Sequence, residues 1–187
     1  MVPQAAKEVY AMDKHVKLLM VVKDPVVTLM SAFSRQVSAS GPIRYTFLKE
    51  ENGTRTVNGA LYSVARGLYS VHLKHWLRYF PLSQLHILDG GALVKDPIGQ
   101  TQAVERFLQV PPRLTEDNFF FNQTKGFYCL KPFTMREPKC LGKNKGRPHV
   151  TLPPDVKKLL YDFYRPYNQE LFRLIGKSFD WEPKDKV

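Results

Sequence analysis

A lysine and a serine eight positions apart are the residues of this chain whose chemistry is easiest to name. Lys23 follows the run 17–22, whose length and β-branched residues are typical of a buried strand in a parallel sheet. Asp24 is then a suitable helix N-cap, and Pro25 suits the first helical position. A cation, a helix N-terminus and the hydroxyl of Ser31 together predict a phosphate site. The alternative is an ordinary strand–turn–helix with a solvated lysine.

The second candidate is a basic segment that is interrupted by glycines. It places Lys143, Lys145 and Arg147 beside Gly142 and Gly146. Glycines let the main chain approach an anion closely, while flanking cations hold the anion in place. The segment therefore indicates an anion-binding loop, and the alternative is a solvated basic loop without a ligand.

Two cysteines and two glycosylation sequons bear on the compartment. A bond between Cys129 and Cys140 would close a loop of about a dozen residues, stabilise the fold by roughly 3 kcal/mol and imply an oxidising compartment. The alternative is two unpaired buried thiols. The sequons at Asn52 and Asn122 favour secretion and predict glycosylation. Because His149 is the only histidine near the cysteines, a closed zinc site lacks ligands and no metal is expected.

Composition narrows the class of partner. Hydrophobic residues make up 43% of the 187 residues and the net charge is +11, so the chain is globular and suited to polyanions. No helix-turn-helix or zinc pattern occurs, and cations and aromatics are not interleaved as stacking platforms, which argues against nucleic acid. No apolar stretch approaches the ~20 residues of a membrane span, so no membrane anchor is expected in this chain. Residues 1–5 lack the features of a signal peptide.

Hydrophobic periodicity and helix-breaking residues predict the elements. The predicted elements are helices over 5–14, 25–37, 60–79 and 97–110, strands over 17–23 and 85–88, a loop over 38–58, short strands at 119–121 and 126–128, and a C-terminal helical pair over 153–164 and 166–175 that is broken at Pro166. Strands separated by helices predict an α/β fold with a mainly parallel sheet. Only two core strands are convincing, whereas such sheets normally have four or more. We therefore expect one partial domain over 1–187 that lacks N-terminal elements.

Five runs of residues carry a family pattern. They are Val22–Val26, Trp76–Leu82, Phe120–Phe127, Cys140–His149 and Phe163–Asn168. The most specific are Asn-Gln-Thr-Lys-Gly-Phe at 122–127 and Cys-Leu-Gly-Lys-x-Lys-Gly-Arg at 140–147. With these runs the chain resembles the heparan sulfate glucosaminyl 3-O-sulfotransferases from Lys17 to Trp181.

The resemblance implies a P-loop-like α/β sulfotransferase fold and a reaction. The reaction would transfer a sulfuryl group from 3′-phosphoadenylyl sulfate to the 3-hydroxyl of a glucosamine in heparan sulfate. Lys23 and Ser31 would then bind the 3′-phosphate of the nucleotide. The loop Lys145-Gly146-Arg147 would contact the nucleotide and the acidic sugar chain, to which Lys143 would also bind.

The resemblance also implies that Cys129 and Cys140 form a disulfide beside the nucleotide, and that the protein resides in the Golgi lumen. Two residues depart from the family. Lys23 stands where arginine is usual, which keeps the charge but loses the bidentate fork. Arg35 stands where a sugar-binding glutamine is usual, with Gln36 one position later, so both are candidates for substrate binding.

The largest departure is that the family's N-terminal third has no counterpart in this chain. That third holds the Lys-x-Gly-Thr-Arg loop that cradles the 5′-phosphosulfate, and the glutamate that serves as general base. We therefore assign no catalytic residue within this chain and expect a fragment or a shortened isoform with little or no turnover. The alternative function is a non-catalytic module that binds heparan sulfate.

Overall fold

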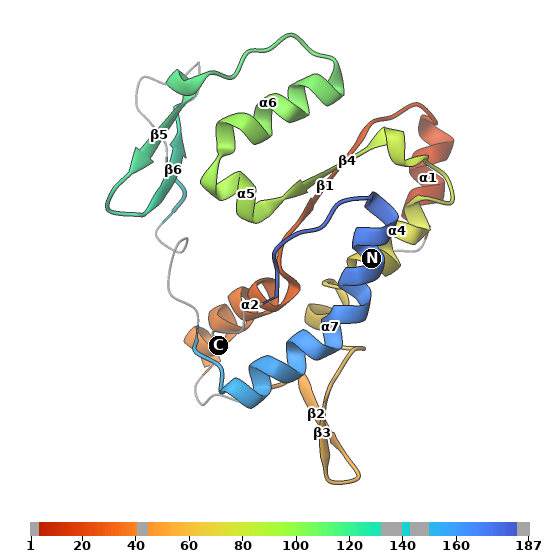
Figure 1. The fold of residues 1–187 in the computed structure, drawn as a ribbon, viewed down its shortest axis with the longest axis vertical. Helices are drawn as coiled ribbons and strands as arrows, with labels where there is room; N and C mark the ends of the chain where they lie inside the picture. Colours follow the sequence, from red (N-terminus) through yellow and green to blue (C-terminus); the bar gives the residue numbers. More distant parts are fainter. Residues whose placement is uncertain (1–3, 41–44, 132–139, 143–149, 183–187) are drawn as a thin grey trace. The chain divides into compact units, whose positions relative to one another are not determined.

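The computed structural model describes residues 4–40, 45–131, 140–142 and 150–182. The chain forms two compact units, and most of their helices and strands are labelled in Figure 1. Unit 1 comprises Met1–Val16, Lys23–Leu82 and His149–Val187, and unit 2 comprises Lys17–Val22 and Ser83–Pro148. None of the described helices is both long and apolar enough to cross a membrane.

Unit 2 is built on a pair of parallel strands, β1 (Leu18–Val22) and β4 (Leu85–Asp89). Their register runs without a bulge from Leu18 opposite Leu85 to Val22 opposite Asp89. Parallel pairing of these two strands confirms the α/β fold class that was expected from the alternation of strands and helices.

The other helices and strands described in unit 2 are two helices and a hairpin. The elements are α5 (Gly90–Lys95), α6 (Pro97–Leu108), a 3₁₀ turn at Glu116–Asn118, β5 (Phe119–Asn122) and β6 (Phe127–Leu130), after a 3₁₀ turn at Leu82–Gln84. Asp96 Oδ1 accepts a hydrogen bond from Gly99 N at 2.9 Å, which confirms Asp96 as the cap of a helix beginning at Pro97. Asp89 caps α5 in the same way, through Gly91 N at 2.9 Å.

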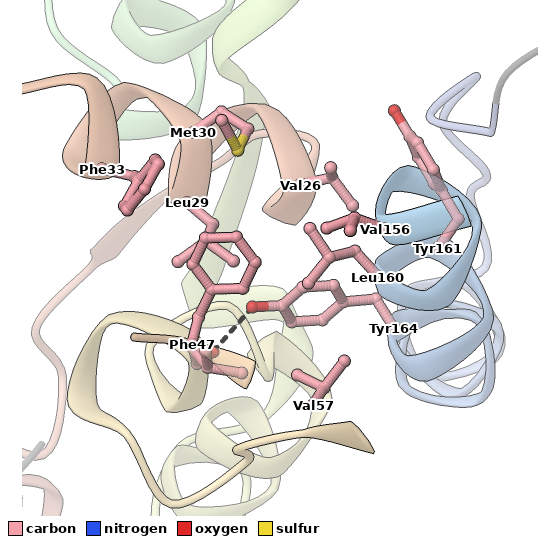
Figure 2. Close-up of a cluster of buried hydrophobic side chains, with 11 residues drawn as sticks. Val26, Leu29, Met30, Phe33, Phe47, Val57, Val156, Leu160, Tyr161 and Tyr164 are labelled. Atoms are coloured by element: carbon pink, nitrogen blue, oxygen red, sulfur yellow. Dashed lines mark hydrogen bonds between the residues drawn. The ribbon is translucent and has the colours of Figure 1, made fainter. Parts of the chain in front are cut away.

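Unit 1 is mainly helical, with one small antiparallel hairpin. Its elements are α1 (Ala5–Met12), α2 (Pro25–Ser40), β2 (Leu48–Glu51), β3 (Thr54–Val57), α3 (Tyr62–Ala65), α4 (Tyr69–Trp76) and α7 (Pro154–Ile175). α7 contacts α2, α4 and β3. Figure 2 shows the core between them. It contains Val26, Leu29, Met30, Phe33, Phe47, Val57, Val64, Val156, Leu160, Tyr161 and Tyr164.

The expected loop over 38–58 contains the hairpin β2–β3. Its two turn residues, Asn52 and Gly53, have φ of 52° and 73°. Two consecutive positive φ angles define the tight turn that matches strand twist, and Asn-Gly is its preferred sequence. The hairpin was therefore missed although its signal was present.

Two helical predictions need correction. The expected single helix over 60–79 is two helices, α3 and α4, with Gly67 between them. The expected helical pair at the C-terminus is one continuous helix, α7, with Pro166 inside it. Proline removes one backbone donor, but α7 buries side chains both before and after Pro166, and this packing outweighs the lost hydrogen bond.

Candidate functional site

The N-terminus of α2 has no free backbone donor in its first turn. Asp24 Oδ1 accepts hydrogen bonds from Val26 N at 2.8 Å and Val27 N at 3.3 Å. The Asp24 carbonyl accepts from Thr28 N at 2.9 Å, and Pro25 has no N–H. The predicted cap and first residue are thus confirmed. A phosphate cannot be held by these amides, because the protein's own carboxylate already occupies them.

Binding of an anion here would therefore depend on side chains. Lys23 and Ser31 are both exposed, and neither side chain has a hydrogen-bond partner among the described residues. Ser31 lies six residues after Pro25, which is roughly 9 Å along the helix axis. The structure leaves both groups accessible, and their binding of a phosphate stays a prediction.

Two phenols, one buried and one half-buried, contact the segment that carries Lys23. Tyr161 Oη, from α7, donates a hydrogen bond to Asp24 Oδ2 at 2.9 Å. Tyr69, the first residue of α4, hydrogen-bonds with the Thr28 side chain and the Lys23 backbone. Sequence analysis missed both tyrosines, because each looks like an ordinary position on an amphipathic helix.

Burial governs the acid–base properties of this group. Desolvation raises the pKa of Asp24 above its usual value, although the hydrogen bonds from Tyr161, Val27 and Val26 oppose the rise. Burial also raises the pKa of Tyr69, and burial together with the Asp24 carboxylate raises the pKa of Tyr161. Both phenols therefore stay protonated at neutral pH, and Tyr161 donates to the Asp24 carboxylate.

A second buried tyrosine, Tyr164, and a glycine also pack around α2. Tyr164 Oη donates to the Val64 carbonyl at 3.0 Å, the bond drawn in Figure 2. A Cβ on Gly67 would lie 2.9 Å from Pro25 Cβ and 3.0 Å from the Tyr164 ring. Glycine is therefore required where the chain passes between α3 and α4, because it lets Tyr69 reach the start of α2.

The predicted disulfide is present between Cys129 on β6 and Cys140, with their Cα atoms 4.7 Å apart. Asn122 Nδ2 donates to Cys140 Sγ at 3.5 Å, and Lys125 Nζ donates to the Leu141 carbonyl. The start of the basic segment is therefore fixed to the β5–β6 hairpin. The predicted binding residues Lys143, Lys145, Gly146 and Arg147 lie outside the described residues.

The residue that follows the basic segment is held on α2. Val150 N donates to the buried Ser34 Oγ at 2.9 Å, three residues beyond Ser31. The backbone of Arg35 and Gln36 continues α2 from there, while their side chains lie outside what the structure describes. Their role in substrate binding stays a prediction.

The two sequons differ in accessibility. Asn52 is exposed at the tip of the β2–β3 hairpin. Asn122 is half-buried, and its side-chain amide is already engaged by Cys140 and by Lys125 N. The structure therefore favours Asn52 over Asn122 as a site of glycosylation.

The acidic residues of the described part of the chain form neither a phosphosulfate cradle nor a metal site. Glu8 is exposed on α1, and Glu50 and Glu51 are exposed on β2 rather than in a loop. No group of three or more His, Cys, Asp or Glu side chains there is arranged to hold a metal ion. Gly53-Thr54-Arg55 repeats the end of the family's phosphosulfate loop, but Gly53 lies in the hairpin turn and Thr54 and Arg55 begin strand β3 rather than a helix.

Comparison with known proteins identifies the family. Residues 3–175 match the Sulfotransferase domain family, and the chain belongs to it. The chain is 39% identical over 180 residues to human heparan sulfate glucosamine 3-O-sulfotransferase 6, covering 95% of this chain and 53% of that protein. It is 39% identical over 184 residues to mouse heparan sulfate glucosamine 3-O-sulfotransferase 3B1, covering 96% and 47%.

A solved structure gives an independent comparison of the fold. The sulfotransferase from Alicyclobacillus acidocaldarius superposes with a TM-score of 0.63 at 17% identity, covering 95% of this chain and 61% of that chain. The expected sulfotransferase fold is thus confirmed. The chain spans about half the length of the 3-O-sulfotransferases that it matches.

Proposed function

We propose that this chain is a heparan sulfate 3-O-sulfotransferase-type polypeptide of the Golgi lumen that binds 3′-phosphoadenylyl sulfate as its sulfuryl donor. The observation that carries the proposal is 39% identity to such enzymes over 95% of the chain. The Cys129–Cys140 disulfide fits an oxidising secretory compartment. In its complete form the enzyme would transfer sulfuryl to the 3-hydroxyl of a glucosamine.

The nucleotide is bound through its 3′-phosphate by the Lys23 amine and the Ser31 hydroxyl. The occupied first turn of α2 supports side-chain binding, because no backbone donor is left there. Each charge-assisted contact to the phosphate contributes roughly 1.5–3 kcal/mol. The segment Lys145-Gly146-Arg147 supplies further contacts to the nucleotide.

The acidic polysaccharide is bound by the basic segment together with α2. Lys143 contacts its anionic groups, and Arg35 and Gln36 contact the sugar. The alternation of cations and glycines in the segment supports this assignment.

Residues 1–187 by themselves bind these ligands but turn over slowly or not at all. Sulfuryl transfer needs cations around the 5′-phosphosulfate and a base near the sugar hydroxyl, and loss of a base typically costs about 10²–10⁴-fold in rate. The candidates Glu8, Glu50 and Glu51 are exposed and do not adjoin a strand–loop–helix phosphate cradle. This observation also favours the second candidate function, a non-catalytic heparan sulfate-binding module.

Calorimetry with adenosine 3′,5′-bisphosphate tests the nucleotide site. Lys23→Ala should weaken binding at least tenfold, because it removes a charge-assisted contact. The matched control is Lys7→Ala, which removes an exposed lysine from α1 and should leave the affinity unchanged. Equal affinities of parent and Lys23→Ala would reject the site.

Heparin chromatography tests the binding of the polysaccharide, and a transfer assay tests catalysis. Replacing Lys143, Lys145 and Arg147 together by alanine should lower the salt concentration at elution, because fewer counterions are then released on binding. A control with the same charge change replaces the lysines at 7, 49 and 177, and it should elute later than the first variant. Sulfuryl transfer by an N-terminally extended chain, but not by 1–187, would select the enzyme; transfer by neither would select the binding module.

A further inference from the structure

The main chain at Lys23, rather than its side chain, is what the protein fixes. The Lys23 side chain is exposed, but its backbone hydrogen-bonds with Tyr69 of α4. The next residue, Asp24, accepts a hydrogen bond from Tyr161 of α7 at 2.9 Å. Two phenols from two different helices thus hold two consecutive residues.

Tyr161 also supplies a hydrogen-bond donor to the second oxygen of the Asp24 carboxylate. Oδ1 accepts from the first turn of α2, and Oδ2 accepts from Tyr161. Among the ion pairs of the described residues there is none between Asp24 and the adjacent Lys23. The charge that lies closest to Lys23 along the chain is therefore directed into hydrogen bonds within the protein, and it does not neutralise the lysine.

We propose that Tyr69 and Tyr161 form a phenol clamp that prepares Lys23 to bind the nucleotide 3′-phosphate. Tyr69 fixes the Lys23 main chain, and Tyr161 withholds the Asp24 carboxylate from the Lys23 amine. Both are positioning residues, since neither needs to touch the phosphate. The inference rests on the proposed function, because it assumes that Lys23 binds this ligand.

A purely structural role for the two phenols is the competing explanation, and Tyr164 provides the control. It is a buried tyrosine of the same helix as Tyr161, but its hydroxyl donates to the Val64 carbonyl in α3. Removing that hydroxyl takes one of two donors from the Val64 carbonyl, which keeps the bond from Gly67 N at 3.0 Å, so Tyr164→Phe should lower the melting temperature. It should not change the surroundings of Lys23.

The test compares two ligands, adenosine 3′,5′-bisphosphate and adenosine 5′-monophosphate, by calorimetry on the full chain. The ratio of their affinities isolates the contribution of the 3′-phosphate. Tyr69→Phe and Tyr161→Phe should each lower this ratio about three- to tenfold, as expected for a charge-assisted contact that is weakened but not removed. Tyr164→Phe should leave the ratio unchanged even where its melting temperature falls as far.

Removing the Asp24 charge tests whether Tyr161 acts by withholding this carboxylate from Lys23. If Tyr161 acts by withholding the carboxylate, Asp24→Asn in the Tyr161→Phe background should restore the ratio toward that of the parent. A lost structural bond would not be restored by this change. Tyr69→Phe keeps the proposal testable should the Tyr161 variant fail to fold.

The possible outcomes distinguish a failure of the proposed 3′-phosphate site from a failure of the clamp. A parent chain that binds the bisphosphate no better than the monophosphate overturns the proposed 3′-phosphate site and the clamp's role with it. A parent that discriminates, with unchanged ratios in Tyr69→Phe and Tyr161→Phe, overturns the clamp alone. A fall in ratio for Tyr164→Phe as large as for the other two variants also overturns it.

Discussion

Strand β1 and helix α2 follow each other directly in the chain, but they differ in how completely their apolar side chains are buried and their backbone donors bonded. On β1, Leu19 is 47% exposed and Val21 is 56% exposed, although parallel strands are normally covered on both faces. On α2, Leu29 is 2% exposed and every donor of the first turn is bonded. The helix that carries the candidate site is therefore complete within unit 1, whereas the strand presents an apolar face to solvent.

The largest expected effect on stability is seen when a leucine of each region is replaced by alanine and the two losses are compared. Leu29→Ala should lower the free energy of unfolding by about 2–5 kcal/mol, because it leaves a cavity in the core shared by α2 and α7. Leu19→Ala should change it by only about 0.5 kcal/mol, as is usual at exposed positions. Urea unfolding measures both, and similar losses would show that the β1 face is covered in solution.

A second prediction concerns the close approach of Gly67 to α2. Gly67→Ala should destabilise the protein by about 1–3 kcal/mol, because its Cβ would press on Pro25 and Tyr164. Gly142→Ala is the control, since a Cβ there would have no heavy atom within 4 Å. Thermal unfolding of both variants checks the prediction, and equal stability of the two would contradict it.

The pH dependence of stability tests the burial of Asp24. Its pKa is raised in the folded protein, so the stability that this carboxyl contributes is fully present below its unfolded pKa and is lost as the pH rises through the folded value. Asparagine at this position does not titrate. The stability advantage of the parent over Asp24→Asn should therefore shrink between pH 3.5 and pH 7.

Urea unfolding of both proteins across this range provides the measurement. An advantage that grows with pH would mean that the helix N-terminus lowers the pKa of Asp24 more than burial raises it. The cap itself should survive, because asparagine is as good an N-cap as aspartate.

The smallest expected effect on stability is at the exposed face of β1. Leu19→Thr with Val21→Thr should change the free energy of unfolding by no more than about 0.5 kcal/mol, but should reduce aggregation, because exposed apolar strands promote association. Light scattering during thermal unfolding checks this. The control is Val22→Thr at a fully buried position of the same strand, which should destabilise.

Local signals predicted much of this fold and part of the site. Asp24 with Pro25 and Asp96 with Pro97 were identified as helix starts, because a cap is made by residues two or three apart. The disulfide between Cys129 and Cys140 was expected from the family resemblance. The Asn52-Gly53 turn was also a local signal. The sequence therefore contained enough information to predict this hairpin, although the segment was interpreted as a loop.

The sequence by itself determined the sulfotransferase family, the paired strands and the capped helix that follows Lys23 and carries Ser31. Tertiary structure alone decided that Gly67 interrupts a helix, that α7 continues through Pro166, and that Tyr161 of α7 donates to the Asp24 carboxylate. The partners concerned are far apart in the chain: Tyr161 and Asp24 are separated by 137 positions. A pattern of neighbouring residues cannot specify such a contact, because which helix face meets which partner depends on how the whole core packs.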